Sequence, residues 1–444
     1  MLKTFKLGGV HPAENKISED KKIEVLPLPK IAYIPISQHL GAPAKPLVNK
    51  GDAIKVGQQI AKGEAFISAN IHSSVSGKVQ KVDTVIDASG YKRTAVVVQV
   101  EGDEWEDGID RTRDIKRDIT LSQKEIIAKI NEKGIVGLGG ATFPSHVKLM
   151  VPDGKKADVL IINGVECEPY LTSDHRLMLE MGEEMMIGVE ILKRALGVNR
   201  AVIGIENNKP DAIEHLSKIA KNFSGIEVQG LKVKYPQGAE KQLIKAIINR
   251  EVPSGKLPIE VGAVVNNSGT AYAVYEAVQK NKPLIERVVT ITGKSVKNPG
   301  NFMVRIGTPV SELIEAGGGL PDDTGKVISG GPMMGKALNS LEAPIVKGTS
   351  GILIMQEEEA ARKQVLNCIR CSRCVSVCPM GLEPYLLEKV VMFEDFERTE
   401  KERVMDCIEC GSCQFTCPAN RPLLDYIRLG KNKVGQIMRA RAKK

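Results

Sequence analysis

Eight of the nine cysteines in this 444-residue chain form two groups of four near the C-terminus. Each group has the spacing C-x2-C-x2-C-x3-C and is followed by a proline, Pro379 or Pro418. Such short spacings let three thiolates meet around one [4Fe–4S] cluster while the fourth cysteine reaches elsewhere. Structural zinc sites usually place their C-x2-C pairs far apart, and disulfides do not fit a chain without an export signal. The pattern therefore predicts two iron–sulfur clusters, which carry single electrons.

The fourth cysteine of each group predicts how the ligands are shared. In two-cluster ferredoxins this cysteine serves the other cluster. The first ligand set is then Cys368, Cys371, Cys374 and Cys417, and the second is Cys407, Cys410, Cys413 and Cys378. Apolar residues recur at helical spacing between the groups, which predicts a helical two-cluster module over residues 356–427. Clusters do no bond chemistry alone, so the chain needs an electron source.

A glycine-rich loop at residues 137–144 is a candidate cofactor site. Its glycines allow the backbone to approach a flat ring or a phosphate, and a lysine downstream can meet a phosphate as a point charge. The loop follows a predicted helix and not a strand, so it does not match a Rossmann fingerprint. A turn with a helix cap explains the loop alone equally well. The candidates are Gly137, Gly139, Gly140, Ala141, Phe143 and Lys148.

Polar residues follow three other predicted elements. Ligands of α/β proteins bind at the carboxyl ends of strands, where carboxylates can hydrogen-bond ribose hydroxyls or a carboxamide. Helix N-termini favour anions. The strand ending at residue 163 supplies Asn163, Glu166, Glu168, Tyr170 and Asp174, a helix start supplies Gly238, Glu240 and Lys241, and a later strand end supplies Asn266, Asn267 and Thr270. The ninth cysteine, Cys167, we interpret as a small buried residue without a redox role.

Alternating elements predict a parallel α/β unit over residues 119–282. The expected strands are 158–163, 200–206 and 226–234, and the expected helices are 176–196, 210–220 and 240–249. A charged linker, 101–118, precedes this unit.

The remaining segments have other patterns. Glycine-punctuated strands in residues 1–100 resemble a lipoyl/biotinyl-type β-barrel; Lys62 lies outside any recognisable attachment tripeptide, which favours a structural barrel. Residues 283–319 resemble a β-grasp-like insert, and we expect 320–355 to close the core.

Composition and charge narrow the class of protein. With 42% hydrophobic and 26% charged residues, packed cores are expected. No apolar run approaches the roughly 18 residues of a membrane span, and the first ten residues lack the apolar core of a signal peptide. Seven of the eight net positive charges lie in residues 428–444, which predicts a basic tail that contacts a membrane or an acidic subunit. The nearly neutral body argues against a nucleic-acid-binding protein. We expect neither a membrane-spanning, a secreted nor a fibrous protein.

These motifs together resemble two related families. The glycine loop, the V-E-C-E-P loop at 165–169, the glycine–glutamate helix start and the asparagine pair resemble the NADH-oxidising flavoprotein subunit of respiratory complex I. The closer resemblance is to the C subunits of Rnf complexes, because Gly8-Gly-Val-His-Pro12, the barrel and the paired cysteine groups occur in the same order. Two positions depart from the complex I pattern: His146 stands where glycine is usual, and Gly269 stands in place of a glutamate.

The resemblance implies a complex I flavoprotein-like α/β core that binds FMN and NAD(H), together with two [4Fe–4S] clusters. It also implies a peripheral subunit at the cytoplasmic face of a cell membrane. Other Rnf subunits are the implied partners, electrons are exchanged indirectly with ferredoxin, and the whole complex translocates Na⁺ or H⁺.

A flavin fits this scheme because it converts a two-electron hydride into single electrons. The alternatives are an iron–sulfur subunit without its own NADH or flavin activity, and a scaffold that docks a partner.

Overall fold

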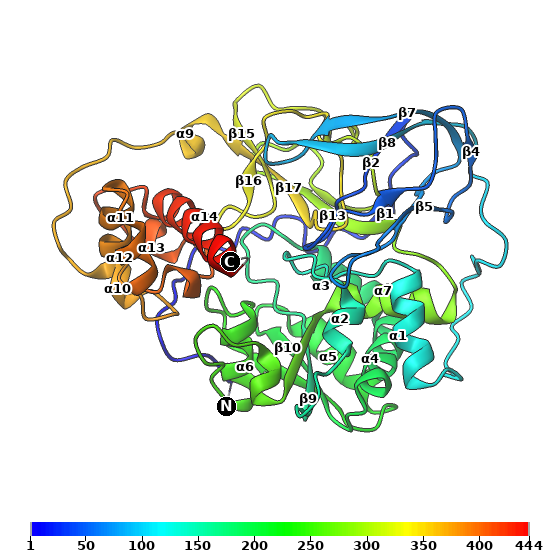
Figure 1. Ribbon diagram of the computed structural model, residues 1–444, viewed down its shortest axis with the longest axis horizontal. Helices are drawn as coiled ribbons and strands as arrows, with labels where there is room; N and C mark the ends of the chain where they lie inside the picture. The colour runs from blue at the N-terminus through cyan, green and yellow to red at the C-terminus, as the bar shows by residue number, and fades with distance from the viewer. Residues whose placement is uncertain (1, 443–444) are drawn as a thin grey trace.

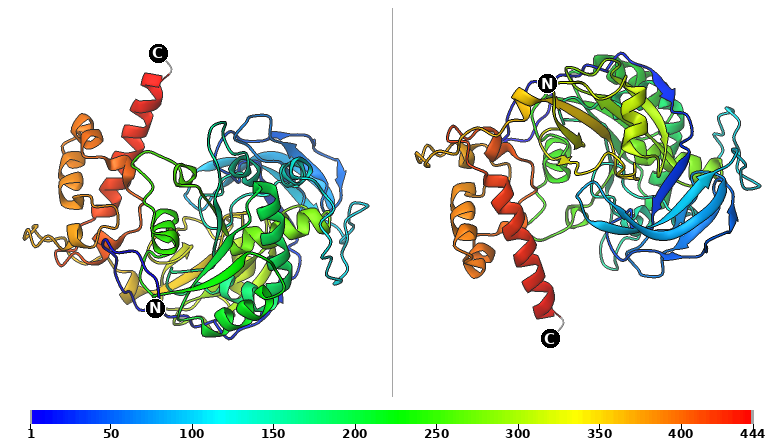
Figure 2. Two further views of the ribbon diagram at one scale, coloured as in Figure 1. Left: turned by 90° about the horizontal axis from the view of Figure 1, so that it is seen from below. Right: turned by 90° about the horizontal axis from the view of Figure 1, so that it is seen from above.

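The structure is a computed structural model that describes residues 2–442. In Figure 1 a unit of helices and parallel strands lies below, a barrel and a mixed sheet lie above it, and a helical module lies to one side. Figure 2 shows the long C-terminal helix of this module projecting from the molecule. No helix within residues 2–442 is long and apolar enough to cross a membrane.

The lower unit is the predicted parallel α/β domain. Its sheet has the order β11-β10-β9-β12 with every neighbouring pair parallel. The strands are β9 (Val159–Asn163), β10 (Ala201–Glu206), β11 (Ile226–Leu231) and β12 (Ala263–Asn267). The helices are α1 (Gln123–Glu132), α2 (Ser145–Leu149), α3 (Ser173–Glu180), α4 (Gly182–Leu196), α5 (Pro210–Ala220), α6 (Glu240–Ile248) and α7 (Ser268–Gln279), with a 3₁₀ turn, η1 (Pro258–Val261). Apolar side chains of both sheet faces and the covering helices form its cores.

One predicted helix of this unit is two helices. The pattern predicted a single helix over 176–196, but the chain breaks at Met181 between α3 and α4. Gly182 favours the break because glycine is a weak helix former. Glycine is also needed here for close packing, since a Cβ would lie 2.9 Å from His215 Nε2.

The N-terminal barrel is two small sheets packed face to face. One sheet has the order β2-β8-β7-β4 and the other β3-β5-β6, and their inward side chains share one apolar core. The strands are β2 (Ile31–Pro35), β3 (Lys45–Pro46), β4 (Ala53–Ile54), β5 (Gln59–Lys62), β6 (Ile71–His72), β7 (Gly77–Ile86) and β8 (Lys92–Val100).

The mixed sheet corrects two predicted boundaries. Its order is β1-β14-β13-β17-β15-β16, built from β1 (Ile23–Val25), β13 (Glu286–Thr292), β14 (Gly300–Arg305), β15 (Thr324–Ser329), β16 (Lys336–Ala337) and β17 (Gly351–Gln356), with helix α8 (Val310–Ala316). Residues 320–355 therefore complete this sheet and do not close the α/β core, because β17 pairs with both β13 and β15. Strand β1 falls within the predicted barrel region, 1–100, but it belongs to the mixed sheet because it pairs with β14.

The helical module contains α9 (Glu357–Ala360), α10 (Arg373–Ser376), α11 (Pro384–Met392), α12 (Phe396–Lys401), η2 (Val404–Asp406), α13 (Ser412–Phe415) and α14 (Leu423–Ala442). The segment 428–444, predicted as a basic tail, continues the last helix of this module as far as the chain is described, and its contact with a membrane or an acidic subunit stays a prediction. Residues 428–442 belong to α14, and its Val434 is fully buried. Lys431 Nζ donates to Cys407 O (2.7 Å) and to Glu409 Oε1 (2.9 Å). Lys431 is therefore bonded within the module; Lys443 and Lys444 lie outside the described residues.

Truncation after Ile427 tests this correction. It removes Val434 and the Lys431 contacts, so we expect a lower melting temperature and loss of bound iron. Burying a valine side chain alone stabilises by roughly 1.5–3 kcal/mol. Truncation after Met438 keeps Val434 and Lys431 and serves as the control. Equal melting temperatures and iron contents for both truncated chains and the full chain would contradict the assignment.

Candidate functional site

The predicted site residues gather at the carboxyl edge of the parallel sheet. β9 lies between β10 and β12, so the loops after β9 and β12 are neighbours at the carboxyl edge of the sheet, and the helices that follow them, α4 and α7, pack in the same apolar core. Ligands of α/β sheets bind outside the carboxyl ends of the strands, and we refer to this edge, between residues 137–144 and the start of α6, as the crevice. Asn163 and Asn267, the last residues of these two strands, are register partners. The local sequence predicted each strand end, and the sheet order brings them together.

The glycine loop lies over this edge. Leu138 N donates to Thr270 Oγ1 (2.9 Å), which ties the loop to the start of α7. Gly137 N donates to Phe143 O (2.9 Å) and closes the loop. Gly140 has φ +120, and a Cβ there would meet nothing within 4 Å. The exposed backbone around Gly140 therefore faces open space beside the strand ends.

The start of α6 forms a second wall of the crevice. Lys148 Nζ donates to Glu240 Oε1 (3.0 Å) and to Val265 O (2.9 Å). Asn163 Nδ2 donates to Gly238 O (2.8 Å), which fixes the turn before α6. Lys241 is not brought to the site, since its Nζ is directed to Pro253 O at 3.4 Å.

Cys167 packs behind this wall. Gly238 N donates to its Sγ (3.3 Å), and burial raises the pKa of its thiol. A raised pKa makes a thiol less reactive, and the lack of a redox role for Cys167 stays a prediction.

The two glutamates of the loop after β9 use their carboxylates on backbone amides. Glu166 Oε1 accepts from Asp174 N (2.8 Å) and its Oε2 accepts from His175 N (3.1 Å), which caps α3. Glu168 Oε2 accepts from Met333 N (3.1 Å) and its Oε1 from Met334 N (2.8 Å). Burial raises the pKa of Glu168 to about 7. If these carboxylates also bind a ribose or a carboxamide, the ligand must share them with the backbone amides or displace those amides.

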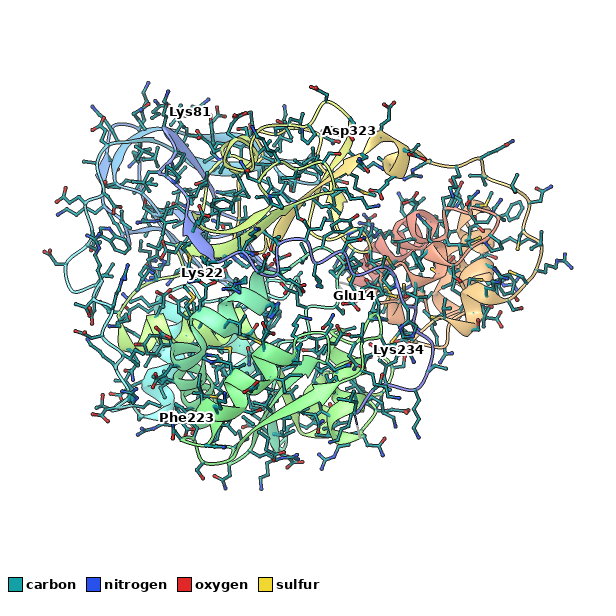
Figure 3. The ribbon with its side chains drawn as sticks, turned by 180° about the vertical axis from the view of Figure 1, so that it is seen from behind. Glu14, Lys22, Lys81, Phe223, Lys234 and Asp323 are labelled. Atoms are coloured by element: carbon teal, nitrogen blue, oxygen red, sulfur yellow. The ribbon has the colours of Figure 1, made fainter. Side chains whose placement is uncertain are left out.

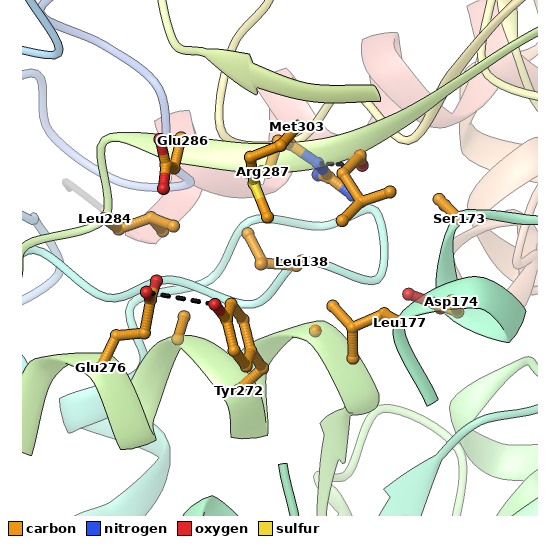
Figure 4. Close-up of a pocket in the computed structure, with 13 residues that line it drawn as sticks. Leu138, Ser173, Asp174, Leu177, Tyr272, Glu276, Leu284, Glu286, Arg287 and Met303 are labelled. Carbon is orange, nitrogen blue, oxygen red and sulfur yellow. Dashed lines mark hydrogen bonds between the residues drawn. The ribbon is translucent and has the colours of Figure 1, made fainter. Parts of the chain in front are cut away.

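Asp174 joins this edge to a small pocket behind it. Asn267 Nδ2 donates to Asp174 Oδ2 (2.6 Å), and burial raises the pKa of Asp174. Figure 4 shows Asp174, Leu138 and Arg287 around the pocket, which is lined from α3, α7 and β13. Tyr170 is buried in the same loop with φ +70, and it packs against the mixed sheet instead of the crevice.

Lys16 was missed by the sequence analysis and organises the loop after β9. Its buried Nζ donates to three carbonyl oxygens, those of Glu166 (2.8 Å), Glu168 (2.9 Å) and Leu171 (2.7 Å). Burial, reinforced by Lys209, lowers its pKa to about 8. A lone lysine far from the loop in sequence carries no signal of this role. Figure 3 shows the N-terminal segment, with Glu14 and Lys22 labelled, running between the α/β unit and the mixed sheet.

The same N-terminal segment reaches the cysteine module. Gly9 N donates to Val377 O (2.9 Å), next to Cys378. Gly8 has φ +68, and a Cβ there would lie 2.6 Å from the Cys378 carbonyl carbon. The Gly8-Gly9 pair is therefore required by close approach to Cys378.

The first set of cysteines lines one pocket. Cys368, Cys371, Cys374 and Cys417 surround it, together with Tyr385, Glu388 and Arg421. Cys368 and Cys371 are exposed. Three of these cysteines come from the first group and one from the second, which is the combination that the spacing predicts.

The second set of cysteines is more deeply buried. Burial raises the pKa of the Cys413 thiol, and the neighbouring thiols of Cys407, Cys410 and Cys378 raise it further. Tyr235 Oη donates to Cys410 O (2.8 Å), and Gln242 Nε2 donates to Pro379 O (3.1 Å). Since Gln242 lies on α6, the second set is the one that adjoins the crevice.

Comparison with known proteins assigns these parts to named families. The Nuo51 FMN-binding domain matches residues 130–276, and the RnfC barrel sandwich hybrid domain matches 3–103. The SLBB domain matches 288–337, and the 4Fe-4S dicluster domain matches 360–418. These matches confirm the predicted barrel, flavoprotein-like core and two-cluster module.

Full-length relatives decide the family. The C subunit of the proton-translocating ferredoxin:NAD(+) oxidoreductase complex of Clostridium ljungdahlii is 50% identical, covering 87% of this chain and 84% of the relative. The corresponding protein of the Na(+)-translocating complex of Acetobacterium woodii is 45% identical, covering 97% of both chains. This chain belongs to the RnfC family. RnfC proteins are subunits of multi-subunit complexes, and the FMN-binding and dicluster domains make this chain an electron-transfer subunit.

A solved structure shares the fold of the RnfC chain. It is a crystal structure of an NAD+-reducing [NiFe]-hydrogenase in the H2-reduced state, with a TM-score of 0.52 and 17% identity. The match covers 71% of this chain and 63% of the hydrogenase chain.

Replacing Lys16 by methionine tests its role. Each buried carbonyl left without a donor costs about 1–3 kcal/mol, so we expect Lys16→Met to lower the free energy of unfolding by roughly 2–4 kcal/mol. The variant should also bind less FMN, because the loop after β9 would lose its fixed shape. Lys22→Met changes an exposed lysine of the same segment and should behave as the parent chain. Unchanged denaturation midpoints and flavin content in Lys16→Met would show that the three contacts are dispensable.

Proposed function

We propose that this chain oxidises NADH at FMN bound in the crevice at the ends of β9 and β12, and that electrons leave singly through two [4Fe–4S] clusters. Bound FMN supplies the conversion between a hydride and single electrons. The observation that carries the proposal is the position of the second cysteine set next to the crevice. Tyr235 donates a hydrogen bond to the carbonyl of Cys410, and Gln242 of α6 donates one to the carbonyl of Pro379, the residue after Cys378. A route from a two-electron site to one-electron carriers is therefore built into one chain.

The residues present fit FMN. Backbone that faces open space around Gly140 suits a flat ring or a phosphate, and Gly137, Gly139, Ala141 and Phe143 complete this loop. Asn266 Nδ2 is buried without a hydrogen-bond partner among the described residues, and a polar ligand atom can satisfy such a group. We assign Lys148, with Nζ at the strand ends, to the phosphate. The remaining groups for the flavin and the nicotinamide nucleotide are Asn163, Gly238, Glu240, Asn267 and Thr270.

Glu166 and Glu168 hold the loop beside the nicotinamide or its ribose, and Asp174 lies next to them. Their carboxylates already accept backbone amides, so we give them a positioning role in which any direct contact with NADH uses a remaining lone pair. The side chain of Lys241 is directed to Pro253 O, and Tyr170 packs against the mixed sheet. We therefore place both residues at the edge of the proposed site.

The cysteine sets fit two clusters. The four thiols of the outer set line one pocket, the four of the inner set lie close enough to raise the pKa of Cys413, and thiolates are the ligands that such clusters use. We assign Cys378, Cys407, Cys410 and Cys413 to the cluster nearer the flavin. Cys368, Cys371, Cys374 and Cys417 then hold the cluster at the outer end of the module.

Within the complex, we propose that the chain is a peripheral subunit at the cytoplasmic face of the membrane. Its partners are membrane-embedded and iron–sulfur Rnf subunits, and it exchanges electrons with ferredoxin only through them. The names of the relatives in Clostridium and Acetobacterium support coupling to the movement of H⁺ or Na⁺ by the whole assembly.

A second candidate is an iron–sulfur or docking subunit without its own NADH or flavin activity. The occupied hydrogen-bond sites of Glu166 and Glu168 are the observation that favours it. Anaerobic reconstitution with iron, sulfide and FMN, followed by titration with NADH, separates the two. Bleaching of flavin and cluster absorbance supports the first candidate, and cluster absorbance that NADH leaves unchanged supports the second.

Gly140→Val tests the flavin loop. A side chain there would project into the space in which we place FMN, so we expect flavin content and NADH oxidation to fall at least tenfold. Gly154→Val is the matched control, because Gly154 also has positive φ and no atom within 4 Å of an added Cβ, but lies outside the crevice. Full flavin content in Gly140→Val would remove the loop from the site.

Single cysteine variants test the sharing of ligands. Cys378→Ser and Cys407→Ser should each remove the same electron paramagnetic resonance signal, and Cys371→Ser should remove the other one. Iron content and spectra of the reduced proteins provide the measurement. If Cys378→Ser and Cys371→Ser instead removed one common signal, each sequence group would build its own cluster.

A further inference from the structure

The barrel has an exposed apolar surface beside the glycine loop. Leu40 is 58% exposed, Phe66 is 68% exposed and Ile67 is 37% exposed. Leu40 belongs to the connection between β2 and β3, and the other two belong to the hairpin loop between β5 and β6; we refer to the three residues as the apolar rim. Single exposed apolar side chains are common, but a group of them on one surface indicates a binding site.

Backbone contacts fix the apolar rim to the glycine loop. Leu40 N donates to Thr142 O (3.2 Å), and Ala42 N donates to Ile67 O (3.0 Å). Gly41, between these two donors, has φ +114, and a Cβ there would overlap Ile67 O, so the close approach requires glycine. Figures 1 and 2 show the barrel beside the α/β unit. The rim therefore continues the edge of the crevice from the α/β domain onto the barrel.

The hairpin loop that carries Phe66 is also held at its far end. Ala69 N donates to the buried His39 Nε2 (3.1 Å). Asn70 Nδ2 donates to Glu132 O (3.2 Å) at the end of α1. The ring of Phe66 is thus exposed on a backbone that is already ordered, so a ligand that contacts it does not have to order the loop.

An exposed aromatic ring distinguishes this surface from the rest of the barrel. Within residues 2–442 the exposed aromatic side chains of the barrel are Phe66 and Tyr91, and Tyr91 lies on the β7–β8 hairpin. Of the two, only Phe66 is on a loop that packs against the segment bonded to Thr142. Aromatic rings stack on other flat rings, so Phe66 indicates a planar ligand group.

NADH has such a group at the end remote from the flavin. Hydride transfer requires contact between the nicotinamide and the flavin ring, which we place at Gly140, so the adenylate half extends past the glycine loop. Adenine is uncharged at neutral pH, and bases stack readily on aromatic side chains. The apolar rim has the matching composition, with one aromatic and two aliphatic side chains and no charge.

We propose that the apolar rim is the adenine subsite of the NADH site, with Phe66 against the face of the base and Leu40 beside it. This rests on the proposed function for the position of the nicotinamide. The barrel then contributes to substrate binding in addition to its structural role. Another subunit could cover an apolar surface of this kind, and nucleotide binding by the chain alone separates the two uses.

The test uses the full chain reconstituted with iron, sulfide and FMN, with ferricyanide as the electron acceptor. Phe66→Ala should raise the KM for NADH about tenfold and leave kcat within twofold of the parent, as expected for the loss of one stacked base. Reduced nicotinamide mononucleotide lacks the adenylate half, so the variant and the parent should oxidise it equally. ADP-ribose lacks the nicotinamide, and titration calorimetry should show a tenfold loss of its affinity without any redox reaction.

Three further variants define the contribution of the ring. Phe66→Tyr keeps the ring and should retain the parent KM and the parent affinity for ADP-ribose. Tyr91→Ala removes a similarly exposed ring (65%) from another hairpin of the same barrel and should behave as the parent. Leu40→Ala should raise the KM for NADH about threefold, because it removes the smaller contact.

Several results would overturn the proposal. They are absent or unchanged binding of ADP-ribose in Phe66→Ala relative to the parent, an equal loss in Tyr91→Ala, and an equal rise in the KM for reduced nicotinamide mononucleotide. Normal nucleotide binding by Phe66→Ala together with lost assembly onto Rnf membranes would instead make the rim a subunit interface. Failure of the proposed function is separate, since NADH would then leave the flavin of the parent unbleached while ADP-ribose binding still depended on Phe66.

Discussion

The shape of the loop between Asn163 and Ser173 depends on one buried ammonium group. The loop must reverse direction at the end of β9, and its carbonyl oxygens point inward, where water cannot satisfy them. Lys16 supplies the donor for three of these oxygens from a segment about 150 residues away in sequence. With its backbone fixed, the loop can direct the Glu166 carboxylate at the start of α3 and the Glu168 carboxylate at the loop of the mixed sheet.

The contacts of this loop also join the separate units of the chain. Glu168 binds the amides of Met333 and Met334, and Tyr235 bonds to Cys410 of the helical module. A Cβ on Gly411 would lie 2.8 Å from Met333 O, so the helical module packs against the loop of the mixed sheet that donates to Glu168. Electron transfer depends steeply on distance, and these contacts hold the inner cysteines at a fixed position relative to the crevice.

Charge is distributed in accordance with this arrangement. Cations close to the inner cysteines are neutralised within the module, as Lys431 and Arg428 are by Glu409. Around the outer cysteines, Arg421 pairs with Glu388 (2.8 Å) and Arg362 pairs with Asp425 (2.7 Å).

The sequence alone determined the chemistry and most of the local structure. Ligand spacing is a local property, so the two cysteine groups predicted clusters and their shared fourth ligands, and the periodicity from residue 119 to 282 predicted the parallel sheet. The sequence alone did not predict contacts between segments that are far apart along the chain. Nothing local distinguishes Lys16 from other lysines, and the charges of 428–442 alone do not show that Val434 among them is buried. Residues 320–355 belong to the mixed sheet only through pairing with β13 and with each other. Tertiary structure decided these points because a buried ammonium, a helix face and a strand edge each acquire their role from partners that the neighbouring sequence does not contain.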